Sequence, residues 1–212
     1  HMWAVIGRTE EKIDYEVYLP HRNHQEQFMG NGFVQPFCDT PLDEEIVGEN
    51  VYLNIINKAR RYVYICTPYL IIDNEMMTAL CLAAKNGVDV RIMTPGTPDK
   101  KLVFLLTQSY YRQLLENGVK IYEYQPGFLH AKTFVCDDEI AVVGTINLDY
   151  RSLYLHFEDG VWIYGNDVIW SMKEDFVQTL EDCHTVPLEF CKNRKIPVRI
   201  MQNVLRAFAP ML

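Results

Sequence analysis

From residue 46 to residue 181, amphipathic segments of helical length alternate with short apolar segments typical of β-strands. Helices are expected over 47–61, 74–87 (with Asp73 as N-cap), 98–117 and 167–181, and strands over 62–68, 88–95, 119–124, 131–136, 139–144 and 153–165. Strands separated by helices of this length require crossovers, which place strands parallel and helices over the sheet. The pattern therefore predicts an α/β fold with a mixed, mostly parallel β-sheet sandwiched between α-helices.

Residues outside this alternation have a different character. Residues 3–45 lack sustained periodicity and include Pro36 and Pro41, so we expect an inter-domain linker there and the folded domain over 46–212. His21 and His24 have no partners at ligand spacing and are better interpreted as exposed linker residues than as metal ligands. The opening His1-Met2 resembles a cloning remnant, so we expect a fragment whose membrane anchor lies upstream.

Composition excludes some classes of function. The 28 acidic and 20 basic residues give a net charge of -8, which opposes broad binding to a nucleic-acid backbone. No run of 18 apolar residues is present that could span a bilayer. The six cysteines form no C-x-x-C pair, and several lie in apolar runs, which favours reduced thiols and a cytosolic setting.

The stretch "FLHAKTFVCDDEIAVVGTINLDYRSL", residues 128–153, reads as a β-hairpin followed by a polar continuation. With the turn at residues 137–138, the numbers of opposed residues add up to about 275, so Lys132 is expected opposite Val143 and His130 opposite Thr145. Alternation along each strand then places four polar side chains on one face: His130, Lys132, Thr145 and Asn147.

These residue types suit an anionic substrate. Lysine supplies a fixed positive charge, asparagine an amide donor and threonine a hydroxyl. Histidine can act as a nucleophile or carry a proton near neutral pH. Glu158, on the next expected strand, is placed to accept a hydrogen bond from the second ring nitrogen of His130 and fix its tautomer.

The spacing H-x-K-x4-D-x6-G-[ST]-x-N resembles the HKD signature of the phospholipase D superfamily. Its positions are His130, Lys132, Asp137, Gly144, Thr145 and Asn147. The wider text, including "TPYLIIDNEMMTALCLAAKNGVDVRIMTP" and "GTINLDYRSLYLHFE", is similar to the C-terminal half of bacterial cardiolipin synthases. The similarity covers roughly residues 35–212. Threonine at 145, where many relatives have serine, keeps the hydroxyl.

The resemblance implies a phospholipase D-like fold and a site built from two facing HKD motifs, without a metal ion or other cofactor. One histidine would attack a phosphodiester to give a phosphohistidine, and the other would protonate the leaving alcohol. In a cardiolipin synthase, both substrates are phosphatidylglycerol and glycerol leaves. Lys132 and Asn147 would contact the phosphate, Glu158 would orient the histidine, and Asp137 would be structural.

This chain carries one HKD motif, and no second H-x-K occurs before it. The facing half-domain must therefore come from an N-terminal half of a parent chain or from a homodimer mate, and we expect the isolated monomer to be nearly inactive. The other expected partners are phosphatidylglycerol and the anionic surface of the bacterial cell membrane, on its cytoplasmic face, with no nucleic acid.

Other interpretations stay open. The same motif serves phosphodiesterases in which water is the acceptor, either a phospholipase D or a nuclease, and a non-catalytic binder of anionic lipid would keep the pocket alone. Tyr69 and Tyr124 follow strands and are candidates for pocket walls, or else ordinary core aromatics. Arg151 is a candidate for holding a second anionic head group, or else forms a salt bridge with Asp149 or Asp159.

The final 21 residues, 192–212, contain five basic side chains and no acidic one. The basic residues are Lys192, Arg194, Lys195, Arg199 and Arg206. The apolar residues at helical spacing on one side are Ile200, Met201, Val204, Leu205 and Phe208. The segment is expected either to close the domain as a core-facing amphipathic helix or to lie on an anionic membrane leaflet.

Overall fold

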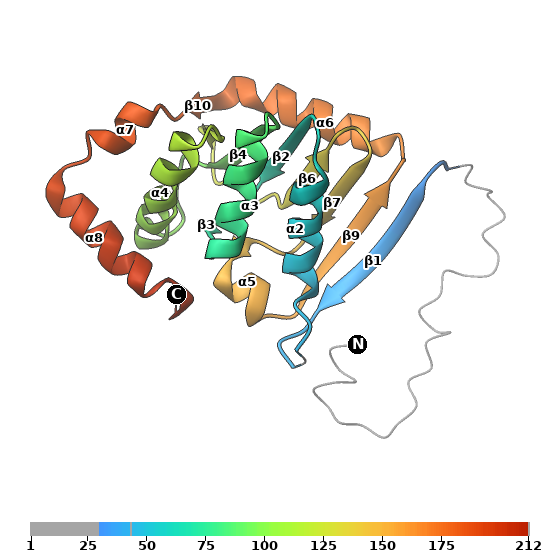
Figure 1. Ribbon diagram of the computed structural model, residues 1–212, viewed down its shortest axis with the longest axis horizontal. Helices are drawn as coiled ribbons and strands as arrows, with labels where there is room; N and C mark the ends of the chain where they lie inside the picture. The colour runs from blue at the N-terminus through green and yellow to red at the C-terminus, as the bar shows by residue number, and fades with distance from the viewer. Residues whose placement is uncertain (1–29, 43, 212) are drawn as a thin grey trace. The chain divides into compact units, whose positions relative to one another are not determined.

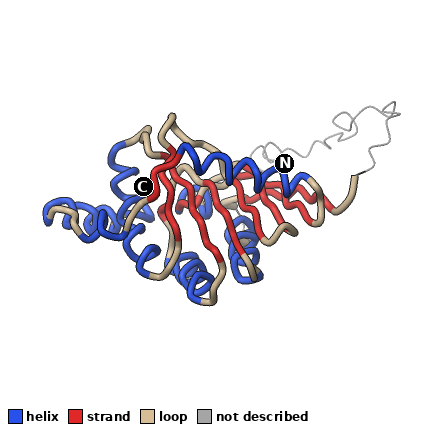
Figure 2. Tube along the Cα trace, turned by 90° about the horizontal axis from the view of Figure 1, so that it is seen from above, coloured by secondary structure: helices blue, strands red, loops and turns tan. Residues whose placement is uncertain are grey.

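The computed structural model describes residues 30–42 and 44–211, which form an eight-stranded β-sheet with helices on both faces (Figures 1 and 2). In spatial order, its strands are β1 (Phe33–Asp39), β9 (Glu158–Tyr164), β7 (Ile140–Gly144), β6 (Thr133–Cys136), β2 (Tyr62–Cys66), β4 (Asp89–Pro95), β5 (Lys120–Tyr124) and β10 (Cys183–Thr185). Two short strands, β3 (Leu70–Ile71) and β8 (Leu148–Asp149), pair in parallel as a second sheet.

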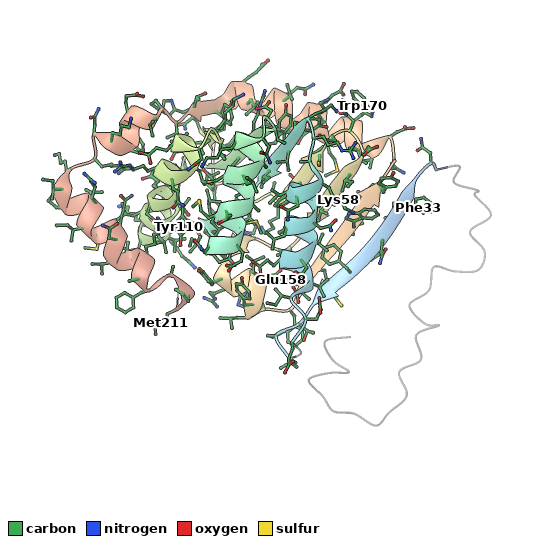
Figure 3. The ribbon with its side chains drawn as sticks, in the orientation of Figure 1. Phe33, Lys58, Tyr110, Glu158, Trp170 and Met211 are labelled. Carbon is green, nitrogen blue, oxygen red and sulfur yellow. The ribbon has the colours of Figure 1, made fainter. Side chains whose placement is uncertain are left out.

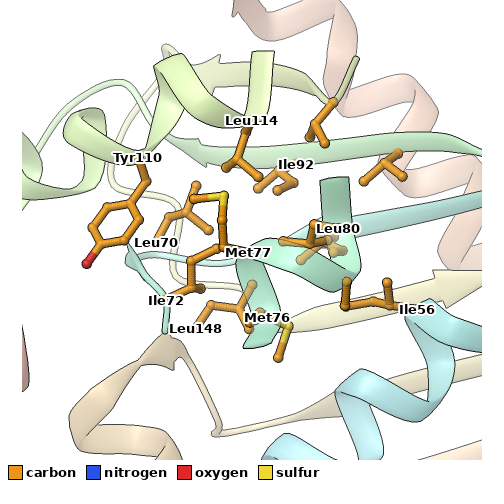
Figure 4. Close-up of a cluster of buried hydrophobic side chains, with 14 of the residues drawn as sticks. Ile56, Leu70, Ile72, Met76, Met77, Leu80, Ile92, Tyr110, Leu114 and Leu148 are labelled. Carbon is orange, nitrogen blue, oxygen red and sulfur yellow. The ribbon is translucent and has the colours of Figure 1, made fainter. Parts of the chain in front are cut away.

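Helices cover the two faces of the large sheet. Helices α2 (Val47–Lys58), α3 (Asn74–Lys85) and α4 (Lys101–Glu116) cover one face, and α6 (Val168–Thr179) covers the other (Figure 2). The remaining helices are α5 (Tyr150–Tyr154), α7 (Leu188–Lys192), α8 (Ile196–Ala207) and two short 3₁₀ turns, Leu180–Asp182 and Ala209–Met211. The larger hydrophobic core lies under α2, α3 and α4 (Figure 4), with Ile56, Met76, Met77, Leu80, Ile92 and Leu114 all buried.

The sheet is mixed, as predicted, but the expectation that it is mostly parallel is wrong. Only the β2–β4 and β4–β5 pairs are parallel, whereas β1–β9, β9–β7, β7–β6, β6–β2 and β5–β10 are antiparallel. Helical crossovers connect the neighbouring strands β2, β4 and β5. Helices α2 and α6 also connect β1 to β2 and β9 to β10, but those strands are not neighbours in the sheet. The later strands β6 and β7 are joined by a tight turn, which requires antiparallel pairing.

The first strand corrects the expected linker boundary at residue 45. Residues 33–39 form an edge strand of the large sheet, paired with β9 from Phe33 opposite Tyr164 to Asp39 opposite Glu158. Its sequence gave little sign of a strand because the side chains of 33–36 are all exposed, and Pro36 is tolerated only at such an edge. Residues 1–29, with the expected cloning remnant, His21 and His24, lie outside the described residues.

Three helix termini expected from the sequence are confirmed, the start of α3 and the ends of α3 and α4. The Asp73 side chain accepts a hydrogen bond from Met76 N at 2.8 Å and caps α3. Gly87 and Gly118, after α3 and α4, have φ values of 91° and 93°, which glycine adopts without strain.

The expected strand over 153–165 begins later than predicted. Its first residues belong to α5, which starts because Asp149 Oδ1 accepts a hydrogen bond from Ser152 N at 2.9 Å. The strand itself begins at Glu158. An N-cap thus prevails over the apolar run that follows it.

The HKD hairpin has a register one residue away from the predicted one. Thr133, rather than Lys132, is opposite Val143. The reason is the connection, which contains residues 137–139, with Asp137 and Asp138 at φ values of 55° and 62°. Aspartate tolerates this left-handed conformation better than most residues. Lys132 is therefore beside Gly144, whose N–H donates to Lys132 O at 3.3 Å.

The C-terminal helix α8 packs on α4 with an unexpected face. Gln202 is buried and donates to Leu105 O at 3.2 Å, and the Arg206 guanidinium lies 4.4 Å from the Tyr110 ring centroid. Of the five predicted apolar residues, only Leu205 is partly buried, while Ile200, Met201, Val204 and Phe208 are exposed. Among the helices of the described residues, none has the length and apolar character needed to cross a membrane.

Candidate functional site

His130 lies in the loop between β5 and β6, with an exposed side chain. Two neighbouring aromatic side chains lie on one side of it, with Phe128 packed on His130 and Tyr69 packed on Phe128. The Phe128 ring centroid lies 5.5 Å from that of His130 and 6.3 Å from that of Tyr69. Tyr69 is held by a hydrogen bond of 2.6 Å from its hydroxyl to Asp99 Oδ2. The imidazole is therefore accessible to a substrate, and the neighbouring aromatic rings restrict the side from which the substrate can approach.

Lys132 is buried directly beneath His130. Its Nζ donates to His130 O at 2.7 Å and lies 3.1 Å from His130 Nδ1. Only 9% of the side chain is exposed. Burial lowers the pKa of the Lys132 ammonium, and the negative charges of Glu158 and Asp149 act in the opposite direction. The ammonium is thus a point charge held close to the imidazole.

This contact selects a tautomer of His130. An ammonium group can only donate, so Nδ1 accepts from charged Lys132, and the proton of the neutral ring resides on Nε2. In this arrangement, Nε2–H can donate a hydrogen bond to an approaching oxygen. Attack by Nε2 on a phosphorus atom requires that this proton leave first.

Glu158 is held by Thr145 rather than by His130. The Thr145 hydroxyl donates to Glu158 Oε2 and accepts from Asp159 N at 2.9 Å. His156 Nδ1 lies 3.7 Å from Glu158 Oε1. Figure 3 places Glu158 at the start of β9, next to α5. Within residues 30–42 and 44–211, no hydrogen bond joins His130 to Glu158, so the expected orienting contact is not made in this conformation.

Asn147 connects the hairpin to α5. Its Nδ2 donates to the Ser152 hydroxyl at 2.8 Å, while its Oδ1 is buried without a hydrogen-bond partner among the described residues. A half-turn of the amide keeps the Ser152 contact, because a hydroxyl both donates and accepts, and turns the NH₂ group toward the position of the unpaired oxygen. The amide can thus offer donors to substrate oxygens.

Two motif residues hold the backbone in place. Asp137 accepts hydrogen bonds from three successive amides, Arg60 N at 2.7 Å, Arg61 N at 2.9 Å and Tyr62 N at 2.9 Å, which fastens the hairpin turn to the start of β2. At Gly144, a Cβ atom would lie 2.3 Å from Asp159 O, so only glycine permits β7 and β9 to approach this closely.

Apart from Thr145, three residues were predicted to bind substrate, and they do not all lie in the same place. Tyr69 and Arg151 line one pocket, together with Asn147. Tyr124 instead packs in the smaller hydrophobic cluster on the opposite face of the sheet. Arg151 Nη2 lies 3.3 Å from His156 Nε2. In the described part of the chain, no ion pair joins Arg151 to Asp149 or Asp159.

Three other residues of this site were not predicted from the sequence. His156, in the bend between α5 and β9, contacts both Glu158 and Arg151. Ser152 holds Asn147, and Phe128 packs on His130. Spacing alone could have flagged His156, whereas Ser152 becomes relevant only through α5.

The assembled groups can bind and polarise an anionic ester. An imidazole and an ammonium are in contact just before β6, an amide follows the end of β7, and a hydrogen-bonded carboxylate lies at the start of β9. Within the residues described, no group of three or more His, Cys, Asp or Glu side chains could hold a metal ion. The described site provides one histidine at the motif, so two-histidine chemistry needs a second half.

Comparisons with known proteins fit this geometry. A family model described as "Cardiolipin synthase, PLD-like domain" matches residues 52–180. A protein named cardiolipin synthase from Clostridium perfringens (strain SM101) is 40% identical over 213 residues, covering 99% of this chain and 44% of that protein. The chain therefore spans less than half the length of that relative.

Solved structures share the fold. Phosphatidylserine synthase from Haemophilus influenzae matches 84% of this chain and 45% of its own length, with a TM-score of 0.65 and 18% identity. The phospholipase D family member Nuc from Salmonella typhimurium matches 74% of this chain and 99% of its own length, with a TM-score of 0.62 and 18% identity. The likeness confirms the expected fold class.

Proposed function

This chain belongs to the cardiolipin synthase, phospholipase D-like domain family, and from that premise we propose that it forms half of the active site of a phosphatidyltransferase. The reaction joins two phosphatidylglycerol molecules and releases glycerol. The observation that carries the proposal is the contact between the Lys132 ammonium and the exposed His130 ring, with Asn147 and Glu158 anchored nearby.

The proposed reaction has two displacements. A histidine nitrogen attacks the phosphorus of the first phosphatidylglycerol, a P–N bond forms, the P–O bond to glycerol breaks, and the second histidine protonates the departing glycerol oxygen. The primary hydroxyl of a second phosphatidylglycerol then attacks the phosphohistidine, gives its proton to the second histidine and releases the first. Lys132 and Asn147 stabilise the charged phosphate oxygens in both steps.

His130 is one of the two histidines of this scheme, and the second belongs to the facing half. To act as the general acid, His130 must be an imidazolium and release its Nδ1 contact with the Lys132 ammonium, because an ammonium cannot accept a hydrogen bond. That half is either the N-terminal part of a longer chain or a second copy of this one, and both arrangements fit the lengths of the two solved structures that share the fold. An isolated monomer should be nearly inactive.

We also propose that α8 rests on the anionic cytoplasmic leaflet of the cell membrane. Its exposed residues Ile200 and Val204 form an apolar stripe. Lys192, Lys195 and Arg199 are exposed on the same segment, which contains no acidic residue from 192 to 212. Each basic side chain near an anionic surface contributes roughly 1 kcal/mol.

Vesicle co-sedimentation tests the membrane surface. The double variant Ile200→Asn with Val204→Asn should lose binding to phosphatidylglycerol vesicles. A matched double variant at Leu82 and Val177, exposed apolar residues on α3 and α6, should bind as the unmodified chain does. Equal binding by both double variants, or equal binding to phosphatidylcholine vesicles, contradicts the assignment.

The catalytic proposal is tested on the full-length parent protein and its His130→Ala variant. Both are incubated with phosphatidylglycerol, and cardiolipin, phosphatidic acid and glycerol are measured by mass spectrometry. We expect cardiolipin and glycerol from the parent and at least a hundredfold less from the variant, since general acid–base groups contribute about 10² to 10⁴ in rate. Phosphatidic acid without cardiolipin would show a hydrolase, and unchanged product from the variant would remove His130 from the mechanism.

A further inference from the structure

The pocket lined by Tyr69, Asn147 and Arg151 adjoins the HKD motif. It has a volume of about 240 Å³ and is lined by residues of β3, the start of α4, α5 and the C-terminal 3₁₀ turn. The lining residues that matter here are Tyr69, Lys100, Asn147, Arg151, His156 and Ala209. His130 and Lys132 are not part of its lining, so the pocket is distinct from the reacting imidazole but shares Asn147 with the motif.

Two cations in this pocket lack a neutralising partner. Lys100 and Arg151 form no ion pair with any described residue, and the Arg151 guanidinium instead lies 3.3 Å from the Nε2 atom of His156. The acidic residue in the lining, Asp149, caps α5 and lies close enough to Lys132 to affect its pKa. Positive charge that is not compensated around a concave site attracts an anion.

The pocket is coupled to the motif through hydrogen bonds. His156 Nε2 accepts from Arg151 at 3.3 Å, so the neutral ring carries its proton on Nδ1, which faces Glu158 at 3.7 Å. Glu158 in turn accepts from the Thr145 hydroxyl. An anion held by Arg151 is therefore next to the groups that support the motif.

We propose that this pocket binds the phosphate of the acceptor lipid, a phosphodiester with a free hydroxyl on a short polyol arm. The inference rests on the proposed transferase function and adds the place where the second substrate is held. The volume equals that of about eight water molecules, which accommodates a phosphate with a glycerol unit. Lys100 and Arg151 hold the phosphate, and Asn147 marks the side toward which the hydroxyl extends.

The mouth of the pocket suits a lipid. Ala209 lines the pocket, and its neighbours Phe208 and Met211 expose 53% and 80% of their surface. Figure 3 shows Met211 at the end of the C-terminal segment, below α4. These apolar side chains continue the stripe of α8, so acyl chains leaving the pocket would meet apolar surface rather than charge.

Binding of soluble head groups to this chain tests the proposal without any turnover. Glycerophosphoglycerol, glycerol and inorganic phosphate are titrated by NMR into the unmodified chain and into the variants Lys100→Gln, Arg151→Gln and Arg151→Lys. We expect glycerophosphoglycerol to bind best and its Kd to rise about tenfold or more in each Gln variant, because a charge-assisted contact is lost. Arg151→Lys should recover part of the affinity.

A control variant shows whether loss of any exposed cation has this effect. Lys85→Gln, which removes an exposed cation on α3, should leave the Kd unchanged. Lys100 is exposed, so its variant should fold even if Arg151→Gln does not. An unchanged Kd in Lys100→Gln overturns the pocket assignment, and phosphate binding as tightly as glycerophosphoglycerol overturns the lipid assignment in favour of a free-phosphate site.

Turnover by the full-length parent distinguishes failure of this inference from failure of the proposed function. Because phosphatidylglycerol is both donor and acceptor in this reaction, the Lys100→Gln protein should need about tenfold more of it for half-maximal cardiolipin formation. If the parent makes no cardiolipin at all, the transferase proposal fails, whatever the head-group titrations show. Equal acceptor dependence in parent and variant refutes the acceptor pocket alone.

Discussion

Replacing Glu49 by glutamine should stabilise the chain at neutral and alkaline pH. Glu49 is 6% exposed, and its Oε2 lies 2.8 Å from the Tyr154 hydroxyl, which also lies 2.6 Å from Asp73 Oδ2. One hydroxyl proton cannot serve two ionised carboxylates, so both contacts are hydrogen bonds only when one carboxyl group is protonated. Burial and the neighbouring Asp73 raise the pKa of Glu49 from 4.5 to about 7.

The sign and size of the effect follow from linkage. A carboxyl group whose folded pKa is raised binds its proton more tightly in the folded state, so its contribution is greatest below pH 4.5 and is lost as the pH rises to about 7. Each whole unit of pKa corresponds to about 1.4 kcal/mol, which makes the total loss about 3 kcal/mol. The pKa of Asp73 is lowered, so its own contribution changes below pH 4, outside this window.

Urea unfolding followed by circular dichroism at pH 5 and pH 8 measures the difference. Between these values, the unmodified chain should lose about 2 kcal/mol more stability than Glu49→Gln, because part of the loss occurs below pH 5. Glu174→Gln, at an exposed position of α6, is the matched control and should follow the unmodified chain. Parallel pH profiles for Glu49→Gln and the unmodified chain would refute the reasoning.

Three further substitutions test the motif itself. Asp137→Ala removes the acceptor of three backbone amides and should lower the free energy of unfolding by about 3 kcal/mol, measured in urea. Gly144→Ala places a methyl group against Asp159 O and should cost about 1–3 kcal/mol and move β7 away from β9, seen as changed amide chemical shifts of both strands; an unchanged spectrum contradicts this. Thr145→Val leaves Glu158 without its hydroxyl donor and should reduce cardiolipin formation by the parent protein about tenfold, whereas Thr145→Ser should retain it; equal rates would show that the hydroxyl is dispensable.

The sequence predicted correctly the features that depend on neighbouring residues only. The cap at Asp73, the glycines at 87 and 118 and the turn at 137–138 all act within a few residues, and each lies where expected. Long-range pairing was harder. The hairpin turn was recognised, but its length was not, because two aspartates with positive φ fit either a two-residue or a three-residue connection. Because the connection is one residue longer than predicted, every residue pair between β6 and β7 is shifted by one position.

The side-chain contacts of the site could not be predicted from the sequence and became visible only in the structure. Alternation placed Glu158 near the motif, yet the partner of its carboxylate is decided by the Thr145 hydroxyl and the His156 ring. The contact between Asn147 and Ser152 depends on α5, which the apolar run after it concealed. Motif spacing thus indicated the candidate reactive groups, while their hydrogen-bond partners depend on elements that no spacing rule describes.

The edge strand β1 sets a practical limit for anyone shortening this chain. A cut at residue 46, where periodicity begins, removes all seven residues of β1 that pair with β9. The bare edge of β9 would be free to recruit strands from other molecules, so aggregation during expression is the expected outcome. The same cut removes the Phe37 ring that lies over Gly160, two residues from Glu158, and would loosen the carboxylate as well. A well-behaved domain therefore starts no later than about residue 32.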